Sequence, residues 1–337
     1  MRLEEFSSIG IVGMGQIGAS LALGLRHQLQ VIGFDADPQA AEAAALQGIA
    51  QGASTEELLS ESDLCIFAVP AGRLKSQLAD LQAKRIRPRA VLADVCSTKL
   101  DIDDAVTAYS EAVGPLRYVG LHPLAGNERP GIAGAEAELF RGRTLVVSSG
   151  AAADPEASLS VAALLSSALG SQELFVNPAL HDRVTNFTIQ LPHIFAYLTA
   201  SFSNSIDDAS LLTLLSGNSF ADVTRVARSR PEMVASFLYA DREILLESLS
   251  QVQGRIDVLR DALRGEEDRL AAVLERFAPR TGALALEGYA NTFGGLAGLE
   301  AGDVVAELER ERVLATSIVA EGGRLQVSGF RPTGAGR

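Results

Sequence analysis

An α/β fold followed by an all-helical domain is the architecture that the sequence predicts. Up to Asn177, short apolar runs alternate with helical patterns, which is typical of a doubly wound, mostly parallel sheet. After Asn177 the strand signals stop, and a helical pattern continues to about Leu286. At 337 residues the chain also exceeds the size at which one hydrophobic core keeps growing. We therefore expect a sheet domain over residues 1–177, a helical domain over 178–290 and a C-terminal extension of unknown role over 291–337.

Each predicted strand is an apolar run too short for a helix and consistent with a strand buried on both faces. The first begins at Ser8, and the others cover residues 30–34, 64–69, 90–94, 118–121 and 144–148, with 172–176 expected to close the sheet. Helical patterns fill the intervals, up to Leu25 and then over residues 38–46, 73–81, 99–109 and 155–169.

The predicted helical domain is interrupted mainly near Pro192, Gly217, Pro231 and Gly254. Pro192 lies inside a helical stretch, where it can kink the helix rather than end it. Apolar residues at helical spacing between 245 and 263 indicate core or dimer packing. The extension holds a charged helix candidate over 303–312 and two candidate strands over 314–329, which is too little for an independent domain.

Acidic residues outnumber basic ones by 42 to 29, giving a formal net charge of -13. Such a chain repels a phosphate backbone, so nucleic acid is not an expected partner. Cys65 and Cys96 lie in apolar segments without CxxC or Cys/His spacing, which argues against a disulfide framework and a metal site. The sequence shows neither a signal peptide nor an apolar run long enough to span a bilayer. We expect a cytoplasmic protein without a membrane partner.

The run Gly13-Met14-Gly15-Gln16-Ile17-Gly18 fits GxGxxG and stands between a predicted strand and a predicted helix. Its glycines permit a tight turn, close approach of a pyrophosphate, and close packing of helix on strand. Asp35 ends the next strand 22 residues after Gly13, where its carboxylate can bond ribose hydroxyls and would repel a 2′-phosphate. The sequence therefore predicts a Rossmann-type site for NAD rather than NADP, with all six residues of the run and Asp35 as cofactor contacts.

Three further loops are expected at the same edge of the sheet, where open α/β sheets bind ligands. They follow the predicted strands at Val69-Pro70, at Asp94 to Lys99 and at Leu121 to Gly126. Because these loops would converge near the nicotinamide, we expect Val69, Pro70 and Ser97 to contact the cofactor.

The four histidines differ in their surroundings. His122 directly follows a buried strand at the ligand edge, where a catalytic role and a hydrogen-bonded structural role are equally open. His181 and His193 lie in helical segments, where capping or core roles are commoner. His27 ends the first helix in polar sequence, so we expect it to be solvated.

Five blocks together resemble the prephenate and arogenate dehydrogenase family of tyrosine biosynthesis, over about residues 8–290. They are the GxGxxG turn, Asp94 to Lys99, His122 to Glu128, His181-Asp182 before Leu191-Pro192-His193, and Gly217 to Phe220 leading to Thr224-Arg225. The resemblance implies an NAD-dependent dehydrogenase that forms a homodimer through its helical domain. It also implies that a cyclohexadienyl substrate lies between the two domains.

The resemblance further implies roles for single residues. His122 would be the base that takes the hydroxyl proton of the substrate, and Ser97 would orient it by a hydrogen bond. Arg225 would bind a substrate carboxylate through its guanidinium fork. The remaining substrate-binding residues would be His193, Gln190 and Glu128, the last as a gating or ion-pairing residue. Other roles stay open: a helix N-cap for Ser97, and ordinary surface positions for Arg225 and Glu128.

Two positions depart from the family pattern. Gln190 stands where many relatives have a second pocket histidine, and Val234 stands where a tryptophan is common. Both changes leave the choice of substrate open. Prephenate is the first expectation, because the ammonium of arogenate would need an added carboxylate in the pocket, and the chain offers Glu128 but otherwise the uncharged Asn127 beside it. Arogenate and 4-amino-4-deoxyprephenate are the alternatives, and a catalytically silent NAD-binding regulator is the alternative outside enzymes.

Overall fold

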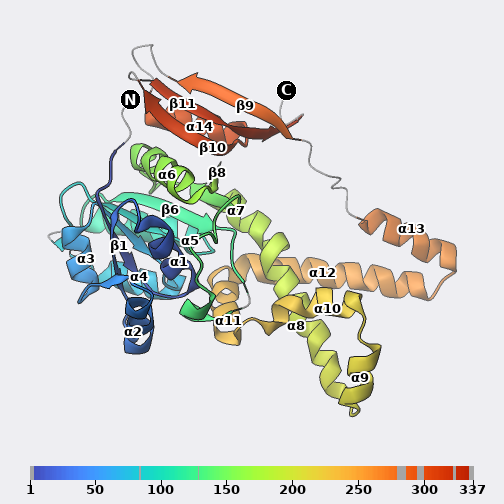
Figure 1. The fold of residues 1–337 in the computed structure, drawn as a ribbon. Coiled ribbons are helices and arrows are strands. Elements are labelled where there is room, and N and C mark those ends of the chain that lie inside the picture. Colours follow the sequence, from blue (N-terminus) through green and yellow to red (C-terminus); the bar gives the residue numbers. More distant parts are fainter. Residues whose placement is uncertain are drawn as a thin grey trace. The chain divides into compact units, whose positions relative to one another are not determined.

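The computed structural model describes residues 4–82, 85–127, 129–278, 286–293, 300–321 and 324–333. Contacts within the chain divide it into two compact units (Figure 1). Unit 1 comprises Met1–Asp182, Ser229–Ala240 and Leu286–Arg337, and unit 2 comprises Arg183–Arg228 and Asp241–Ala285. The C-terminal extension therefore belongs to the same unit as the predicted sheet domain, and the segment 178–290 contributes to both units.

Unit 1 is built on a mixed sheet whose described strands lie in the order β3-β2-β1-β4-β5-β6-β7-β8-β10-β11-β9. The strands from β3 to β6 are parallel, β7 is antiparallel to β6, β8 is parallel to β7, and the last three are antiparallel. This confirms the predicted mostly parallel N-terminal sheet. The strands are β1 (Ser8–Val12), β2 (Gln30–Phe34), β3 (Ala50–Gln51), β4 (Leu64–Phe67), β5 (Val91–Asp94), β6 (Arg117–Pro123), β7 (Thr144–Ser148), β8 (Gln172–Val176), β9 (Leu286–Phe293), β10 (Leu314–Glu321) and β11 (Arg324–Pro332).

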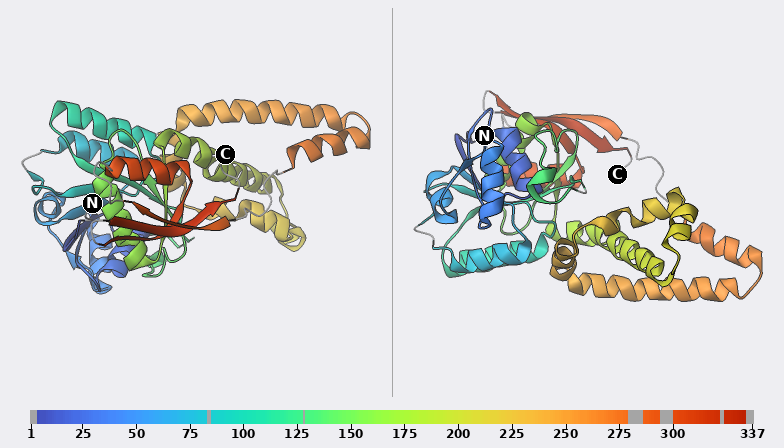
Figure 2. Two further views of the ribbon diagram at one scale, coloured as in Figure 1. Left: turned by 90° about the horizontal axis from the view of Figure 1, so that it is seen from above. Right: turned by 60° about the horizontal axis from the view of Figure 1, so that its bottom comes forward.

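Helices cover both faces of the parallel part of the sheet (Figure 2), where successive apolar residues of a strand point to opposite faces. On β4, Leu64 and Ile66 belong to one core cluster with α1 and α6, whereas Cys65 and Phe67 belong to another with α3, α4 and α5. This is the doubly wound arrangement that the sequence predicts. The helices are α1 (Gln16–Leu25), α2 (Pro38–Leu46), α3 (Thr55–Glu61), α4 (Ala71–Asp80), α5 (Leu100–Ala112) and α6 (Pro155–Leu169).

Helices α2 and α6 each begin at a proline that follows an aspartate, and both begin at the residue that the sequence predicts. The Asp37 carboxylate accepts a hydrogen bond from the Gln39 N–H at 3.0 Å, and Asp154 caps α6 in the same way. Such caps satisfy N–H groups that lack a partner in the first helical turn. The short elements α3 and β3 were not predicted.

The C-terminal extension continues the sheet. The expectation that residues 172–176 close the sheet is wrong, because β10 pairs with β8 through Leu314 and Ala315. An unpaired β8 would leave a row of backbone groups open along its edge, and β10 pairs with this edge at Glu173 and Leu174. Two strands are present between Leu314 and Gly329 as predicted, although the turn at 322–323 lies outside the described residues. Helix α14 (Ala301–Arg310) contacts α6 and β8.

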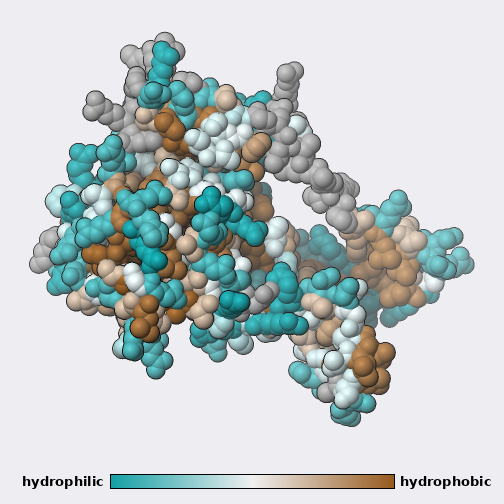
Figure 3. Space-filling view, in the orientation of Figure 1, coloured by the Kyte–Doolittle hydropathy of each residue, from teal (hydrophilic) through white to brown (hydrophobic). Residues whose placement is uncertain are grey.

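Unit 2 consists of helices, as predicted. Pro192 stands at the start of α8, directly after a π-helical turn at Asn186–Gln190, so the helical path is interrupted there. Large apolar side chains remain exposed on unit 2, and Figure 3 shows them over α9 and α13. No helix in the described ranges has both the length and the apolar character needed to cross a membrane. The helices of unit 2 are α8 (Leu191–Phe202), α9 (Ala209–Leu215), α10 (Asn218–Thr224), α12 (Arg242–Leu263) and α13 (Glu267–Phe277), while α7 (Pro178–Thr185) leads into it and α11 (Pro231–Ala240) belongs to unit 1.

Glu173 on β8 places a carboxyl group in the buried interior of unit 1. Its Oε1 accepts a 2.6 Å hydrogen bond from the Ser171 hydroxyl, and its Oε2 has no partner in the described part of the chain. Burial raises the pKa of Glu173 to about 8, so the folded protein holds this group protonated at neutral pH. The stability that it contributes is full below the pKa of an ordinary glutamate and is lost as the pH rises through about 8.

Glu173→Gln is expected to reduce this pH dependence, because a neutral amide mimics the protonated acid. Between roughly pH 5 and 8, the free energy of unfolding of the wild type should fall relative to the variant, by at most about 1.4 kcal/mol per pH unit. Denaturant titrations at pH 5, 7 and 9 measure this, with the exposed Glu321→Gln as control. If wild type and Glu173→Gln lose stability in parallel, the carboxyl group is already ionised in the fold.

Candidate active site

The glycine-rich turn has the backbone geometry that a dinucleotide needs. Gly13 has φ +100°, and a Cβ there would lie 2.5 Å from the Ala68 carbonyl oxygen. A Cβ on Gly18 would lie 1.9 Å from the Gly13 oxygen, so neither position accepts a side chain. Gly15 faces open space just before α1, where a pyrophosphate can approach the helix N-terminus. The residues present therefore fit the cofactor that the motif predicts.

Asp35 lies beside this turn at the end of β2. Its Oδ2 accepts a 2.6 Å hydrogen bond from the Met14 N–H, and its Oδ1 accepts one from the Asp37 N–H at 2.9 Å. The Met14 side chain is fully buried, so only its backbone can face a ligand, and Ile17 packs partly buried against the same core. Val69 is half-buried and Pro70 exposed in the loop that leads into α4. The predicted cofactor residues therefore come together at one edge of the sheet.

Gln16 uses its side chain on the protein itself. Its Nε2 donates to Asn127 Oδ1 at 2.5 Å and to the carbonyl oxygens of Arg129 and Gly134 at 3.2 Å. Its Oε1 accepts from the Asn127 N–H at 3.2 Å. Gln16 thus ties the loop that follows β6 to the first residue of α1, beside the glycine turn.

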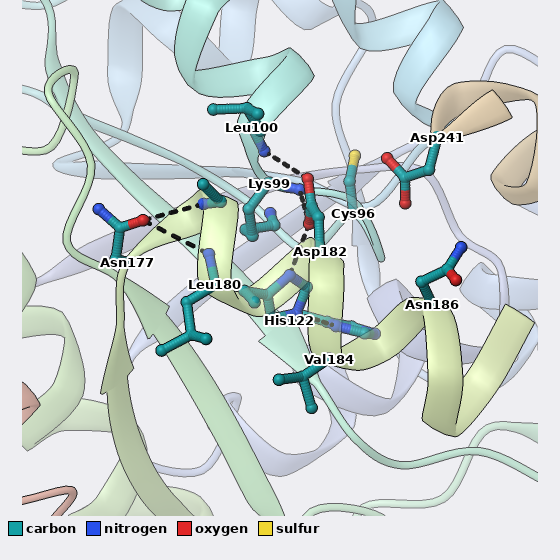
Figure 4. A network of polar contacts seen from close by, with 12 residues as sticks. Cys96, Lys99, Leu100, His122, Asn177, Leu180, Asp182, Val184, Asn186 and Asp241 are labelled. Carbon is teal, nitrogen blue, oxygen red and sulfur yellow. Dashed lines mark hydrogen bonds and ion pairs between the residues drawn. The ribbon is translucent and has the colours of Figure 1, made fainter. Parts of the chain in front are cut away.

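His122 lies near the end of β6 and is buried, with 7% of its surface exposed. Its Nδ1 is 2.9 Å from His181 Nε2, and His181 Nδ1 is 2.7 Å from Asp182 Oδ1 (Figure 4). The Asp182 carboxylate also accepts the N–H groups of Lys99 and Leu100, each at 2.8 Å, and so caps α5. His122, His181 and Asp182 therefore form a chain of hydrogen-bonded side chains that is fixed to the start of α5.

The order of partners in this chain determines which nitrogen of His122 is basic. A carboxylate only accepts hydrogen bonds, so the proton of a neutral His181 lies on Nδ1 and its Nε2 carries a lone pair. His122 must then donate its Nδ1–H to His181, which leaves Nε2 of a neutral His122 unprotonated. Nε2 is therefore the atom that can take a proton from a ligand.

Electrostatics keep His122 neutral. Burial lowers the pKa of His122 well below 6.5, and a positive charge on a protonated His181 and on the Lys99 ammonium lowers it further. Lys99 is itself buried, and its Nζ lies 2.6 Å from Asp94 Oδ1 in an ion pair. Tyr118 donates its hydroxyl to the other oxygen of Asp94. A neutral imidazole is the form of histidine that acts as a base at neutral pH.

Ser97 departs from its expected contact. No hydrogen bond among the described residues joins Ser97 to His122, whose Nδ1 bonds to His181 instead. The alternative role as helix N-cap is wrong: Lys99 is the N-cap residue of α5, and the Asp182 carboxylate accepts the first N–H groups. Ser97 is half-buried between β5 and α5.

The predicted substrate residues of unit 2 lie on neighbouring elements. His193, on α8, is half-buried and its Nδ1 is 2.8 Å from the Ile189 oxygen. Arg225 is exposed and begins the turn Arg225–Arg228, which contacts α8. Gln190 is buried, and its side-chain amide makes hydrogen bonds to Asn186 and to the Asp241 carboxylate within unit 2. Glu128 lies outside the described residues.

Two family models match consecutive parts of the chain. Prephenate dehydrogenase, nucleotide-binding domain, matches residues 21–171, and prephenate dehydrogenase, dimerization domain, matches residues 177–276. The chain belongs to the prephenate and arogenate dehydrogenase family. It is therefore an oxidoreductase of the NAD(P)-dependent prephenate type. The matches start after the glycine turn and end before the C-terminal extension.

Curated relatives and solved structures agree with this family. The chain is 29% identical to prephenate dehydrogenase of Bacillus subtilis, over 77% of this chain and 71% of that protein. It is 24% identical to cyclohexadienyl dehydrogenase of Zymomonas mobilis, over 79% of this chain and 91% of that protein. Synechocystis arogenate dehydrogenase has 26% identity and a TM-score of 0.65, covering 80% of this chain and 96% of that one.

A further structure shares the fold. Prephenate dehydrogenase of Aquifex aeolicus, solved with hydroxyphenyl propionate and NAD+, has 23% identity and a TM-score of 0.70, covering 81% of this chain and 96% of that one.

Sequence reasoning missed two parts of the site. His181 and Asp182 belong to one of the family blocks, but a linear pattern does not show that His181 bonds to His122, 59 residues away. The buried pair of Lys99 and Asp94 was missed because a lysine after a strand usually reads as a surface residue. The short interval between Asp94 and Lys99 at the end of a buried strand was the available signal for it.

Proposed function

We propose that this protein is an NAD-dependent prephenate dehydrogenase that converts prephenate to 4-hydroxyphenylpyruvate and CO2. The observation that carries the proposal is the chain from Asp182 through His181 to His122, which leaves Nε2 of a buried, neutral histidine as a proton acceptor. Oxidation of a ring alcohol requires such a base at the hydroxyl group.

His122 performs the proton transfers of this reaction. The bound nicotinamide supplies the acceptor for the hydride that leaves the ring carbon bearing the hydroxyl. His122 Nε2 takes the hydroxyl proton as the carbon–oxygen double bond forms. The ring carboxylate leaves as CO2, and its electrons make the ring aromatic. His122 then returns the proton to the phenolate oxygen, so the base ends the cycle neutral.

The carboxylates of the substrate need cationic partners, and we propose Arg225 for one of them. A guanidinium binds a carboxylate with two parallel hydrogen bonds, which also fixes its orientation. His193 comes from the adjoining helix of the same unit and would help to hold the substrate. Glu128 stays a proposed gating residue and Ser97 a proposed contact of the cofactor.

We propose NAD rather than NADP because the Asp35 carboxylate lies at the turn where the adenosine ribose would bind. Asp35→Ala is expected to raise the ratio of kcat/KM with NADP to kcat/KM with NAD by roughly tenfold or more, since a repulsive charge is removed. Steady-state rates with both cofactors measure this. Asp37→Ala, which removes a nearby carboxylate that caps α2, is the control. An unchanged ratio in Asp35→Ala would mean that another group reads the ribose.

Prephenate is proposed over arogenate because, next to Glu128, which lies outside the described residues, the chain offers the uncharged Asn127 rather than a second carboxylate for the ammonium of arogenate. Asn127 is uncharged, and its side chain is bonded to Gln16 and to the Gly134 carbonyl oxygen. The test is to compare rates of NADH formation with prephenate, arogenate and 4-amino-4-deoxyprephenate under identical conditions. We expect the highest kcat/KM with prephenate, and a higher value with either amine would reassign the substrate.

The same comparison of rates also tests the alternative that the protein is a catalytically silent NAD-binding regulator. Binding of NADH without turnover of any of the three compounds would favour that function and overturn the enzymatic proposal.

We also propose that the protein is a homodimer through its helical unit. Exposed apolar residues such as Phe202, Leu214 and Leu215 give that unit surface to bury, and its family model is that of a dimerization domain.

A further inference from the structure

The C-terminal extension lies beyond both family models, yet it is part of the interior of unit 1. The core cluster that contains β1 and α6 also includes four fully buried residues of the extension: Val304 and Leu308 on α14, Val313, and Ala315 on β10. Helix α14 contacts α6 and β8, and β10 pairs with β8. The extension is therefore placed to act on the segments that follow β7 and β8.

One side chain of the extension bonds to both of these segments. Glu309, in the last turn of α14, accepts a 2.6 Å hydrogen bond from the Ser149 hydroxyl on Oε2. Its Oε1 accepts the Asn177 N–H at 3.1 Å. Ser149 directly follows β7 and Asn177 directly follows β8, so a single carboxylate joins α14 to the ends of two neighbouring strands.

Asn177 organises the first turn of α7. Its side-chain oxygen accepts the N–H groups of Ala179 at 3.0 Å and Leu180 at 3.4 Å, and its carbonyl oxygen accepts the His181 N–H at 2.9 Å. Asn177 thus acts as the N-cap of the helix, with Pro178 next to it. The helix dipole of α7 also favours the Glu309 carboxylate, which accepts the Asn177 N–H at the N-terminus of this helix.

The residues that hold His122 follow directly on this first turn. His181 and Asp182 lie four and five residues after the cap Asn177, so a shift of Asn177 moves the nitrogen that bonds His122 Nδ1. We propose that Glu309 is a positioning residue: through Asn177 it fixes the start of α7, and so fixes the side chains that orient and tune the catalytic imidazole. The expected effect on kcat rests on the proposed function, whereas the expected effect on the position of His181 does not.

The charged and titratable groups around His122 define a readout that is independent of substrate. His181 and Asp182 face it from α7, and Lys99, paired with Asp94, faces it from the start of α5. If α7 loses its anchor, His122 loses its bond to His181 and gains access to water. Both changes should raise the pKa of His122 toward that of an ordinary histidine.

The experiment measures this pKa by NMR titration of labelled histidine rings in the full chain, which has only four histidines. Glu309→Ala is expected to raise the titration midpoint of His122 and to lower kcat by roughly tenfold, because small displacements of a catalytic group are costly. Affinity for NADH should stay unchanged. Glu309→Gln should restore both values, since its amide oxygen can accept from Asn177 and its NH2 can donate to Ser149.

Glu307→Ala is the matched control, because Glu307 lies on the same helix and pairs with Arg310. It should behave as wild type. If Glu309→Ala does not fold, Glu309→Asp replaces it, since the shorter side chain cannot reach both partners. A variant with a lower Tm but an unchanged His122 midpoint and kcat would overturn the proposal. A shifted midpoint in a protein without prephenate turnover would support the positioning role while overturning the proposed substrate.

Discussion

Replacing His122 by asparagine is expected to lower kcat with prephenate roughly a hundredfold or more, because an amide cannot take the hydroxyl proton. Asparagine has similar size and can still donate a hydrogen bond toward His181, so the fold should persist. The affinity for NADH should stay within about twofold, since the glycine turn and Asp35 are untouched. Absorbance of NADH gives the rates, and a fluorescence titration gives the affinity.

His27→Asn is the matched control for this change, because His27 is exposed at the end of α1. It should leave kcat and affinity unchanged. A His122→Asn protein with a wild-type kcat would remove His122 from the mechanism. Equal losses of kcat and of NADH affinity would instead point to damage of the cofactor site.

The second large effect is expected for Asp182→Asn. The carboxylate holds the His181 proton on Nδ1, and an amide group in its place can present N–H to that nitrogen instead. His181 would then carry its proton on Nε2 and donate to His122 Nδ1, which moves the proton of His122 to Nε2. The wrong nitrogen becomes basic, and kcat should fall by roughly a hundredfold.

Asp182→Asn should also lower the Tm, because Asp182 caps α5 through the N–H groups of Lys99 and Leu100. Asp101→Asn is the control, since Asp101 lies in the first turn of the same helix and its ion pair with Lys75 is at the surface. Rates and thermal unfolding are measured on both variants. If the two variants have the same kcat, Asp182 acts only as a cap and the tautomer argument is wrong.

Local signals in the sequence predicted the nucleotide-binding part of unit 1. The spacing of Gly13, Gly15 and Gly18 and the position of Asp35 depend on backbone geometry within one strand-helix-strand segment, so a linear pattern contains them. Proline after aspartate fixed the starts of two helices for the same reason. Fold class followed from the change of pattern at Asn177.

Tertiary contacts could not be predicted in this way. Ser97 was expected to orient His122, but the ring nitrogen bonds to His181, which comes from a helix after β8. Gln190 was expected in the substrate pocket, whereas its amide bonds to Asn186 and Asp241. The pairing of β10 with β8 joins residues 140 positions apart, and an alternating pattern does not specify its partner strand.

The pH dependence of kcat/KM with prephenate tests the central claim most directly, because His122 must be neutral to act as the base. Its pKa is lowered, so the rate should stay high through neutral pH and fall only below a midpoint that lies under 6.5. That midpoint should match the NMR titration of His122, and the acidic fall should be absent from the residual activity of His122→Asn. An acidic fall with the same midpoint in His122→Asn would contradict the account.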